Sequence, residues 1–524
     1  MKKFASPDVI LGESLKNLSE QTEKPGKATI VDVFWMSILM VFTFVSRMFF
    51  LDMGFGRADA WRVAVTGKFW VEMGEYFPSR PPGFPLVEIV ATISYAIFGS
   101  SPANWIFTNL LTCLVFMASV IGVWLLARKW GIRYPFMVAS VYAFAPLNWV
   151  YSIETIDYLW MTAFIIFSLL ALESGRKYSF LWAGILLGIA TAARFFAGFE
   201  IIPLLILAWY KRRQIKDLVV LFISWLVVSL AFYVVVFMQI TDWTEYFDWF
   251  NRLNIYTAGM AELEGNSFKS RFLMPASGLV GPLASIIWIV ALAWGIPVLV
   301  KKKLAGDRGI WACGLLAFFI MVPYLWHLHP NYWIPATGFL LMLLAQVVNP
   351  KVFFVVGVFI FMANFPWWQQ NIEGLRVFSA DGGNEKIEQY SKDLEAFQNE
   401  TVFSEMTYRQ GTLGSVERLL EFDMPENWVV MVHANLQTIK FLLPEIEEFM
   451  ITTEDGGEIG VWGYTDHGPK YLYLLSPGQI EEVIRAGYEV IYIPGVERLY
   501  YANYGVLIQD VEGVKVAFGT SSAG

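Results

Sequence analysis

The chain has 524 residues, of which 56% are hydrophobic and only 16% are charged. Soluble domains carry roughly 25% charged residues, so lipid rather than water is expected to surround most of this chain. The net charge of −8 is unevenly distributed, because residues 375–524 hold 24 acidic and 10 basic residues. Nothing in this distribution suggests a nucleic-acid partner, and the length calls for at least two folding units.

The N-terminal 29 residues are polar and precede a long apolar run without a cleavable apolar core. They are interpreted as a cytoplasmic tail, followed by an uncleaved membrane anchor. A membrane-spanning helix needs about 20 apolar residues. The predicted fold is therefore a polytopic α-helical membrane protein with about eleven spans over residues 30–366. The predicted spans are 30–51, 102–127, 134–151, 156–173, 178–194, 197–210, 217–239, 278–300, 309–326, 332–348 and 351–366.

Residues 84–99 form a further apolar run, which is short for a span and contains Glu88. If this run lies in the outer leaflet or is re-entrant, every tight cluster of basic residues falls on one side of the membrane. The positive-inside rule makes that side cytoplasmic. The inner residues are then Arg128, Lys129, Arg133, Arg176, Lys177, Lys211, Arg212, Arg213, Lys216, Lys301, Lys302, Lys303, Arg308 and Lys351.

Four segments are consequently expected on the outer side: the loop 52–101, the turn 149–155, the loop 240–277, and residues 367–524. The loop 240–277 is rich in aromatic residues, which suit either an interfacial belt or a lid that stacks on a sugar.

The C-terminal segment 367–524 is predicted to be an extracytoplasmic, soluble α/β domain. Its strands are expected at 427–433, 450–453 and 489–494, and its helices at 436–449 and 477–486. It lacks a glycine-rich phosphate motif, so it is expected to bind the acceptor or to provide structural support.

Ionisable residues at membrane depth are costly and are therefore candidates for function. Those of this chain collect at the predicted outer ends of spans, which favours an outward-facing cavity over a transport route. A structural role is expected for Arg47, which could extend outward from the first span, and for Glu88, which could pair with an arginine. The set is Arg47, Glu88, Glu154, Asp157, Arg194 and Glu200.

The loop 52–101 carries the most informative pattern. Residues 59–73 place apolar groups at helical spacing, as in a helix that lies on the bilayer surface, with Asp59 at the N-cap position. A basic turn, Arg80-Pro-Pro-Gly83, follows. Asp59 could serve only as a helix cap, or it could take part in chemistry.

The order of these features resembles the GT-C superfamily of polyprenyl-phosphate-dependent glycosyltransferases. An acidic residue opens a surface helix after the first span, a basic-Pro-Pro-Gly turn follows, and the run 146–158 ends Ile-Glu-Thr-Ile-Asp-Tyr. The resemblance covers roughly residues 30–345. It is nearest to the branch of protein O-mannosyltransferases and of the aminoarabinose transferases that modify lipid A.

The resemblance implies roles for particular residues. Asp59 matches the catalytic base, with Asp52 a poorer match, and Arg80 matches the residue that contacts the lipid-linked phosphate. Asp157, with Glu154 beside it, matches the acidic residue of the second outer turn. The other matches are Arg194 after the fifth span and Tyr332 at the start of a late span, where Asn331 replaces the usual arginine and His329 could compensate.

The chemistry is consistent with these roles. A carboxylate can deprotonate the acceptor, and arginines can stabilise the departing phosphate. Direct attack at the anomeric carbon would invert its configuration. Asp157 and Glu154 could instead hold Mg²⁺ or Mn²⁺, although two carboxylates three residues apart are a weak signal for metal; no cofactor is firmly expected.

The predicted function is therefore transfer of a hexosyl or pentosyl group from a polyprenyl-phosphate donor to a protein, lipid or glycan acceptor at the outer face of the plasma membrane. This predicts an enzyme of cell-envelope glycosylation. One alternative is a transporter or flippase of lipid-linked glycans, and another is a non-catalytic membrane assembly subunit.

Overall fold

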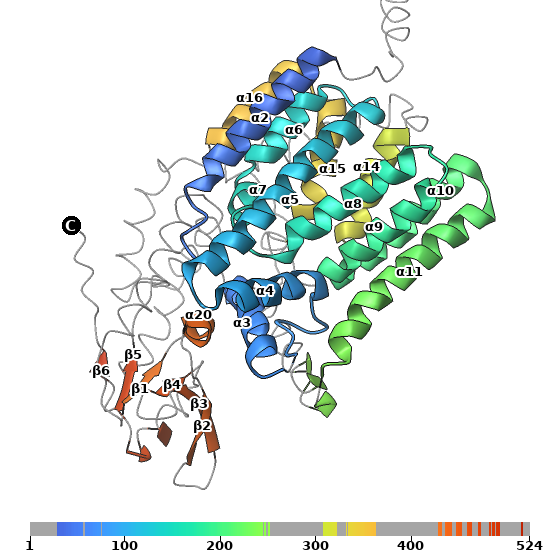
Figure 1. Ribbon diagram of the computed structural model, residues 1–524. Coiled ribbons are helices and arrows are strands. Elements are labelled where there is room, and N and C mark those ends of the chain that lie inside the picture. The colour runs from blue at the N-terminus through green and yellow to red at the C-terminus, as the bar shows by residue number, and fades with distance from the viewer. Residues whose placement is uncertain are drawn as a thin grey trace, which may run out of the picture.

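A computed structural model describes residues 29–251 except 56, 57, 75, 241, 245, 248 and 249, then 308–321, 332 and 334–362, and short stretches between 428 and 516. Most of the described chain is helical, and the helices pack side by side in a bundle (Figure 1). The predicted span 278–300 and most of the loop 240–277 lie outside the described residues.

The first five of the described helices include the two that the loop 52–101 was expected to form. Helices α3 and α4 lie together at one end of the bundle (Figure 1), and they pack closely because Gly67 of α3 brings its backbone against Ala91 of α4. These helices are α2 (Ile30–Met48), α3 (Ala58–Glu72), α4 (Pro85–Phe98), α5 (Pro102–Lys129) and α6 (Pro135–Phe144).

The remaining bundle helices follow the predicted spans closely at most of their boundaries. They are α7 (Pro146–Tyr151), α8 (Asp157–Glu173), α9 (Ser179–Ala193), the 3₁₀ helix η1 (Phe195–Glu200), α10 (Ile201–Arg212), α11 (Ile215–Phe237), α14 (Arg308–Met321), α15 (Ile334–Val347) and α16 (Pro350–Met362).

Two predicted spans differ from the observed helices. The predicted span 134–151 is broken into α6 and α7 at Ala145, because Pro146 lacks an N–H and restricts the residue before it. The short predicted span 197–210 begins as the 3₁₀ helix η1 and becomes α-helical only at Ile201.

Three of the described helices, α2, α5 and α11, are long and apolar enough to cross a membrane. On α2 and α11 large apolar side chains point outward, including Phe34 and Val41 of α2 and Val227 and Leu230 of α11, each more than half exposed. Exposing apolar surfaces of this extent to water would be unfavourable for a monomer, whereas contact with lipid is not. The chain is therefore an integral membrane protein, and the full count of eleven spans stays a prediction.

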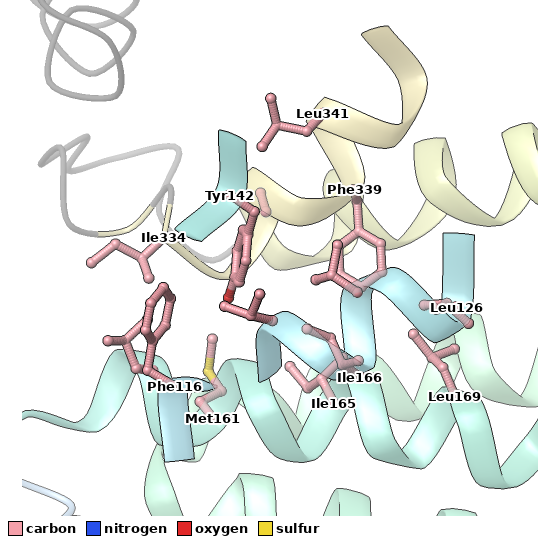
Figure 2. Close-up of a cluster of buried hydrophobic side chains, with 14 of the residues drawn as sticks. Phe116, Leu126, Tyr142, Met161, Ile165, Ile166, Leu169, Ile334, Phe339 and Leu341 are labelled. Carbon is pink, nitrogen blue, oxygen red and sulfur yellow. The ribbon is translucent and has the colours of Figure 1, made fainter. Parts of the chain in front are cut away.

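The core of the bundle forms where α5, α6, α8 and α15 meet. Figure 2 shows Phe116 of α5, Tyr142 of α6, Ile166 of α8 and Phe339 of α15 pointing into one apolar interior. The Tyr142 hydroxyl lies 3.2 Å from the Ser119 hydroxyl, which satisfies its polar atom inside this core. This core holds in place the helix ends that carry the charged residues described below.

Helix α9 lies between α8 and α11, and its contact with α11 depends on glycine. Gly184 and Gly188 are four residues apart, so they lie on one face of α9 and allow the two backbones to approach closely. A Cβ atom at Gly184 would overlap the Ser224 hydroxyl and the Leu221 carbonyl oxygen. A Cβ at Gly188 would lie 2.7 Å from Cβ of Val228.

The C-terminal segment contains a six-stranded mixed sheet with the order β2-β3-β4-β1-β5-β6. Strand β1 is central and pairs in parallel with β4 and β5, while β3 pairs antiparallel with β2 and β4. The strands are β1 (Trp428–Met431), β2 (Glu447–Thr452), β3 (Glu458–Gly463), β4 (Lys470–Leu472), β5 (Glu489–Tyr492) and β6 (Lys515–Val516), with helix α20 (Asn435–Leu442) after β1.

Each of the three predicted strands overlaps an observed one, and the sequence did not predict β3, β4 or β6. The predicted helix 436–449 was too long, since α20 ends at Leu442 and Glu447 already belongs to β2. Pro444 explains the early end, because the residue before a proline disfavours the helical conformation. Most of the predicted helix 477–486 lies outside the described residues, and the division of the chain into domains at 29 and 366 stays a prediction.

The glycine contact between α9 and α11 can be tested by adding one methyl group. Gly184→Ala should destabilise the protein by about 1–3 kcal/mol, because a close-packed backbone contact cannot absorb the extra volume. The measurement is the midpoint of thermal unfolding of the purified protein in detergent. Gly314→Ala is the matched control, because a Cβ there meets nothing within 4 Å, and it should raise the midpoint or leave it unchanged. Equal effects of the two substitutions would contradict the packing argument.

Candidate functional site

Helix α3 presents an acidic and a basic side chain at its start. It begins at Ala58, so Asp59 lies in its first turn rather than at the predicted N-cap position. A carboxylate in the first turn interacts favourably with the helix dipole. Nη1 of Arg62, one turn further on, lies 3.2 Å from Oδ1 of Asp59. The first turn of α3 therefore holds a carboxylate with an arginine beside it.

The segment between α3 and α4 is organised by one buried carboxylate, that of Glu88. Its Oε1 accepts hydrogen bonds from the backbone N–H of Ser79 at 2.8 Å and from the Ser79 hydroxyl at 2.6 Å. Its Oε2 accepts from the backbone N–H of Phe84 at 2.9 Å and from the Tyr76 hydroxyl. Four donors from residues 76–84 thus converge on one side chain and fix the turn that contains Arg80.

Gly83 completes this turn. Its φ of 100° lies in the left-handed region that favours glycine, and a Cβ there would collide with the Tyr76 hydroxyl. The Tyr233 hydroxyl of α11 donates to the Gly83 carbonyl at 3.4 Å and so ties the turn to the bundle. The Arg80-Pro-Pro-Gly83 sequence therefore forms a turn. Its shape depends on the hydrogen bonds to Glu88 and on the positive φ of Gly83.

Arg80 connects helix α3 to helix α8. Its Nη1 donates to Oδ2 of Asp59 at 2.7 Å, and its Nη2 donates to Oδ1 of Asp157 at 3.2 Å. Asp157 is the first residue of α8 and is completely buried, whereas the Asp59 side chain is 28% exposed. One guanidinium thus bridges two carboxylates that are 98 positions apart in the chain.

Arg194, at the C-terminal end of α9, also contacts Asp157. Its Nη1 donates to the second carboxylate oxygen of Asp157, Oδ2, and its side chain is 5% exposed. The guanidinium carbon of Arg194 lies 4.2 Å from the centre of the Tyr158 ring and 5.4 Å from that of Tyr332. Arginine is well suited to a site of this kind, because its planar group can stack on a ring and donate hydrogen bonds at its edge.

The result is a continuous row of alternating charges, in the order Arg62, Asp59, Arg80, Asp157 and Arg194, which we call the charged cluster. Its five charges sum to +1. Burial by itself would lower the pKa of Arg80, but Asp59 and Asp157 outweigh burial and hold the pKa of that guanidinium above its ordinary value. Arg80 therefore stays cationic, and the partly exposed Asp59 and Arg62 lie at the more open end of the cluster.

The structure brings together four of the residues predicted from the sequence: Asp59, Arg80, Asp157 and Arg194. Tyr332 joins them through the Arg194 contact. Glu154 is completely buried just before α8. His329 lies outside the described residues, so its role stays a prediction.

Three further residues at this site were missed by the sequence reasoning: Arg62, Phe84 and Tyr158. The Phe84 ring centre lies 4.7 Å from the guanidinium carbon of Arg80 and 5.6 Å from that of Arg194, so it lies close to both guanidinium groups. The spacing of Asp59 and Arg62 was a usable signal, because residues three apart are neighbours on a helix. No sequence signal marked Phe84, since its role depends on two distant arginines meeting beside it.

Two expectations about buried charges were wrong. Glu88 does not pair with an arginine; hydroxyl and backbone N–H groups surround it instead. Arg47 does not extend outward, because its guanidinium is completely buried and donates to the Ser152 hydroxyl at 2.6 Å and to the Thr43 carbonyl at 2.9 Å. It also packs over aromatic rings, including that of Trp149. Arg47 is a structural residue that joins α2 to α7.

The charged cluster does not fit a divalent metal ion. Each carboxylate oxygen of Asp157 faces an arginine, and both oxygens of Asp59 also do so. Hard cations need several oxygen ligands free of competing cations. Among the described residues, no group of three His, Cys, Asp or Glu side chains is arranged to hold an ion. The cluster is suited to an anion, which the arginines can bind.

No protein-family model matches the chain, and no curated protein matches it. The chain is similar to two solved structures of ArnT from Cupriavidus metallidurans, each with 12% identity. For the apo structure the similarity covers 92% of this chain and 89% of that chain, with a TM-score of 0.44. For the structure bound to undecaprenyl phosphate the values are 91%, 88% and 0.47.

The role of Glu88 in fixing the Arg80 turn leads to a sharp test. In Glu88→Gln the amide nitrogen must face either the Ser79 N–H and hydroxyl or the Phe84 N–H and the Tyr76 hydroxyl. Either orientation leaves a buried backbone donor unsatisfied, at about 1–3 kcal/mol. The unfolding midpoint in detergent should therefore fall clearly. Ser79→Ala is the control, because it removes one donor and leaves Glu88 with three. If Ser79→Ala were as damaging as Glu88→Gln, the carboxylate would not be the organising group.

Proposed function

We propose that this chain is a membrane glycosyltransferase that moves a sugar from a polyprenyl monophosphate carrier to an acceptor hydroxyl or amine. The observation that carries the proposal is that Asp59 and Arg80 lie together. The partly exposed Asp59 carboxylate is 2.7 Å from the Arg80 guanidinium, whose side chain is 12% exposed, and a second arginine lies on the far side of Asp157. A base beside an anion-binding pair of arginines is what this transfer requires.

Asp59 is proposed as the general base, since it is the more exposed of the two carboxylates in the cluster. Without substrate its charge is balanced by Arg62 and Arg80. When the lipid phosphate binds, it competes with Asp59 for the guanidinium N–H groups of Arg80. Asp59 then loses part of its ion pairing, which increases its affinity for a proton and makes it a better base.

Arg80 and Arg194 are proposed to hold the phosphate of the donor. Both lie beside Phe84, and both are oriented by the buried Asp157, which keeps two like charges close together. Preorganised arginines of this kind stabilise negative charge as it develops, without reorganising during the reaction. Tyr158 and Tyr332 complete the wall beside Arg194.

The proposed reaction is a single displacement. The acceptor oxygen or nitrogen attacks the anomeric carbon while its proton passes to Asp59. The bond from the anomeric carbon to the phosphate oxygen breaks, and its electron pair leaves with the polyprenyl phosphate, whose charge Arg80 and Arg194 stabilise. Attack from the face opposite the leaving group inverts the configuration.

The positions of basic residues support a site on the outer face. Lys211 donates to the Leu172 carbonyl at 2.7 Å, so it lies at the C-terminal end of α8, where Arg176 and Lys177 also follow in sequence. Asp157 begins the same helix, and 17 residues span roughly 25 Å at 1.5 Å per residue. If the basic end is cytoplasmic, the charged cluster lies on the outer side, together with the C-terminal sheet. We propose the plasma membrane as the location.

The assay that tests the proposal compares two aspartates of the same loop. Asp59→Asn should lower kcat by about 10²–10⁴-fold, the usual contribution of a general base. The measurement is transfer of labelled sugar from a polyprenyl-phosphate donor to a panel of acceptors. Asp52→Asn is the matched control and should retain wild-type kcat. Asp52 is exposed, and its contact with Trp105 is made by its backbone carbonyl, which accepts from the indole at 3.0 Å. Full activity of Asp59→Asn would rule out the proposed mechanism.

The phosphate-binding role of Arg80 has a separate readout. Arg80→Gln should weaken binding of undecaprenyl phosphate by about tenfold to a hundredfold, since a hydrogen bond to a charged group contributes about 1.5–3 kcal/mol. The measurement is direct binding to the detergent-solubilised protein. Arg176→Gln, an exposed arginine at the opposite end of α8, should bind like the wild type. Equal loss in both variants would indicate nonspecific attraction to the anion.

A further inference from the structure

Helix α20 of the C-terminal segment lies against α3 and the turn that follows α4 (Figure 1). Lys68 of α3 donates to the Lys440 and Phe441 carbonyls at 3.0 and 3.4 Å, and the Ser100 hydroxyl donates to the Phe441 carbonyl at 2.7 Å. These carbonyls belong to the last turn of α20, where a helix has unpaired acceptors and attracts a cation. Residues more than 300 positions apart are therefore joined by specific polar contacts.

The Phe441 side chain adds an apolar contact at the same place. It is completely buried, and its ring centre lies 5.6 Å from that of Trp61, 5.8 Å from that of Tyr95 and 6.5 Å from that of Trp105. The three rings come from α3, α4 and α5, so Phe441 fills the point where these helices meet. Phe55 closes the group by packing edge-on against Trp61.

Trp61 belongs to the turn of α3 that carries the candidate base. Asp59 precedes it by two residues and Arg62 follows it directly. The Trp61 indole donates to the Phe55 carbonyl at 2.9 Å, so the indole ties Phe55 to the first turns of α3. Whatever holds the Trp61 ring therefore holds the backbone from which Asp59 extends.

We propose that helix α20 is a positioning element for the charged cluster, and that Phe441, held among Trp61, Tyr95 and Trp105, sets the position of Asp59. This inference rests on the function proposed above, because it gives the C-terminal segment a role in the transfer step. It extends that function, because α20 would affect kcat through the position of Asp59, although none of the five residues of the charged cluster belongs to α20.

The proposal separates two substrate contacts. Arg80 pairs with Asp59, but the 76–84 turn and Asp157 also hold it, and neither of these contacts involves α20. Asp59 extends from α3, which α20 contacts. Loss of Phe441 should accordingly disturb the base and leave the phosphate contact in place. A misplacement of about 1 Å in a reacting group can cost a hundredfold in rate.

The experiment combines kinetics with hydrogen exchange on the full-length protein in detergent. Phe441→Ala should lower kcat tenfold to a hundredfold with little change in the KM for the polyprenyl-phosphate donor, and it should speed amide exchange in residues 58–72 but not in α8. Phe441→Leu, which keeps most of the apolar volume, should recover part of both effects. Met450→Ala, which removes an exposed apolar side chain from β2 of the same segment, is the control and should change neither.

Each outcome decides a separate question. Unchanged exchange in 58–72 together with unchanged kcat would overturn the positioning role. Equal losses in kcat and donor affinity would also overturn it, because they would indicate general damage to the fold. If Phe441→Ala does not fold, Phe441→Leu and Lys68→Met provide the same comparison with smaller changes. If the wild type transfers no sugar but Phe441→Ala still loosens α3, the proposed function fails while the contact between α20 and α3 stands.

Discussion

The Arg80 guanidinium joins two carboxylates that come from different parts of the chain, and the geometry of the charged cluster depends on this single group. Asp59 stands at the start of a surface helix, and Asp157 stands at the start of a helix in the bundle. Without Arg80 between them, these two negative charges would repel each other. With it, and with Arg194 on the far side of Asp157, the row of charges alternates in sign and can be buried at moderate cost.

The charged cluster is supported by buried side chains that form hydrogen bonds to backbone groups, namely Glu88 and Arg47. Glu88 binds two backbone N–H groups of the Arg80 turn and so converts a loop into a fixed element. Arg47 plays a comparable part deeper in the bundle, where it joins α2 to the break between α6 and α7. Both side chains are ionisable and fully buried, yet neither belongs to the charged cluster. In this chain, burial of an ionisable side chain does not by itself mark a residue of the candidate site.

The surface loop after the first span is therefore held from several directions. The bundle holds it through Tyr233 and Asp157, its own Glu88 holds the turn, and α20 holds α3 through Lys68 and Phe441. Proposed catalysis by Asp59 would depend on all of these contacts together. A loop of about 50 residues could not present a carboxylate and an arginine at hydrogen-bonding distance without them, because the conformational entropy of an unconstrained loop would separate the two groups.

The sequence by itself determined the class of fold and the order of the helices, because apolar runs of fixed length can only be solvated by lipid or by each other. It also singled out Asp157 and Arg194, since a charge beside an apolar run is costly. Asp59 and Arg80 were singled out by the order of the motifs in the loop 52–101 and by the family resemblance that this order carries. It could not determine the partners of those charges. Three contacts show this: Arg80 pairs with Asp157, Ser79 and Phe84 donate to Glu88, and Phe441 packs beside Trp61. The partners are distant in the chain, or their side chains form no recognisable sequence pattern. Only the tertiary structure decided these contacts. The periodicity of a sequence predicts which face of a helix is buried, but it does not predict which residues pack against that face.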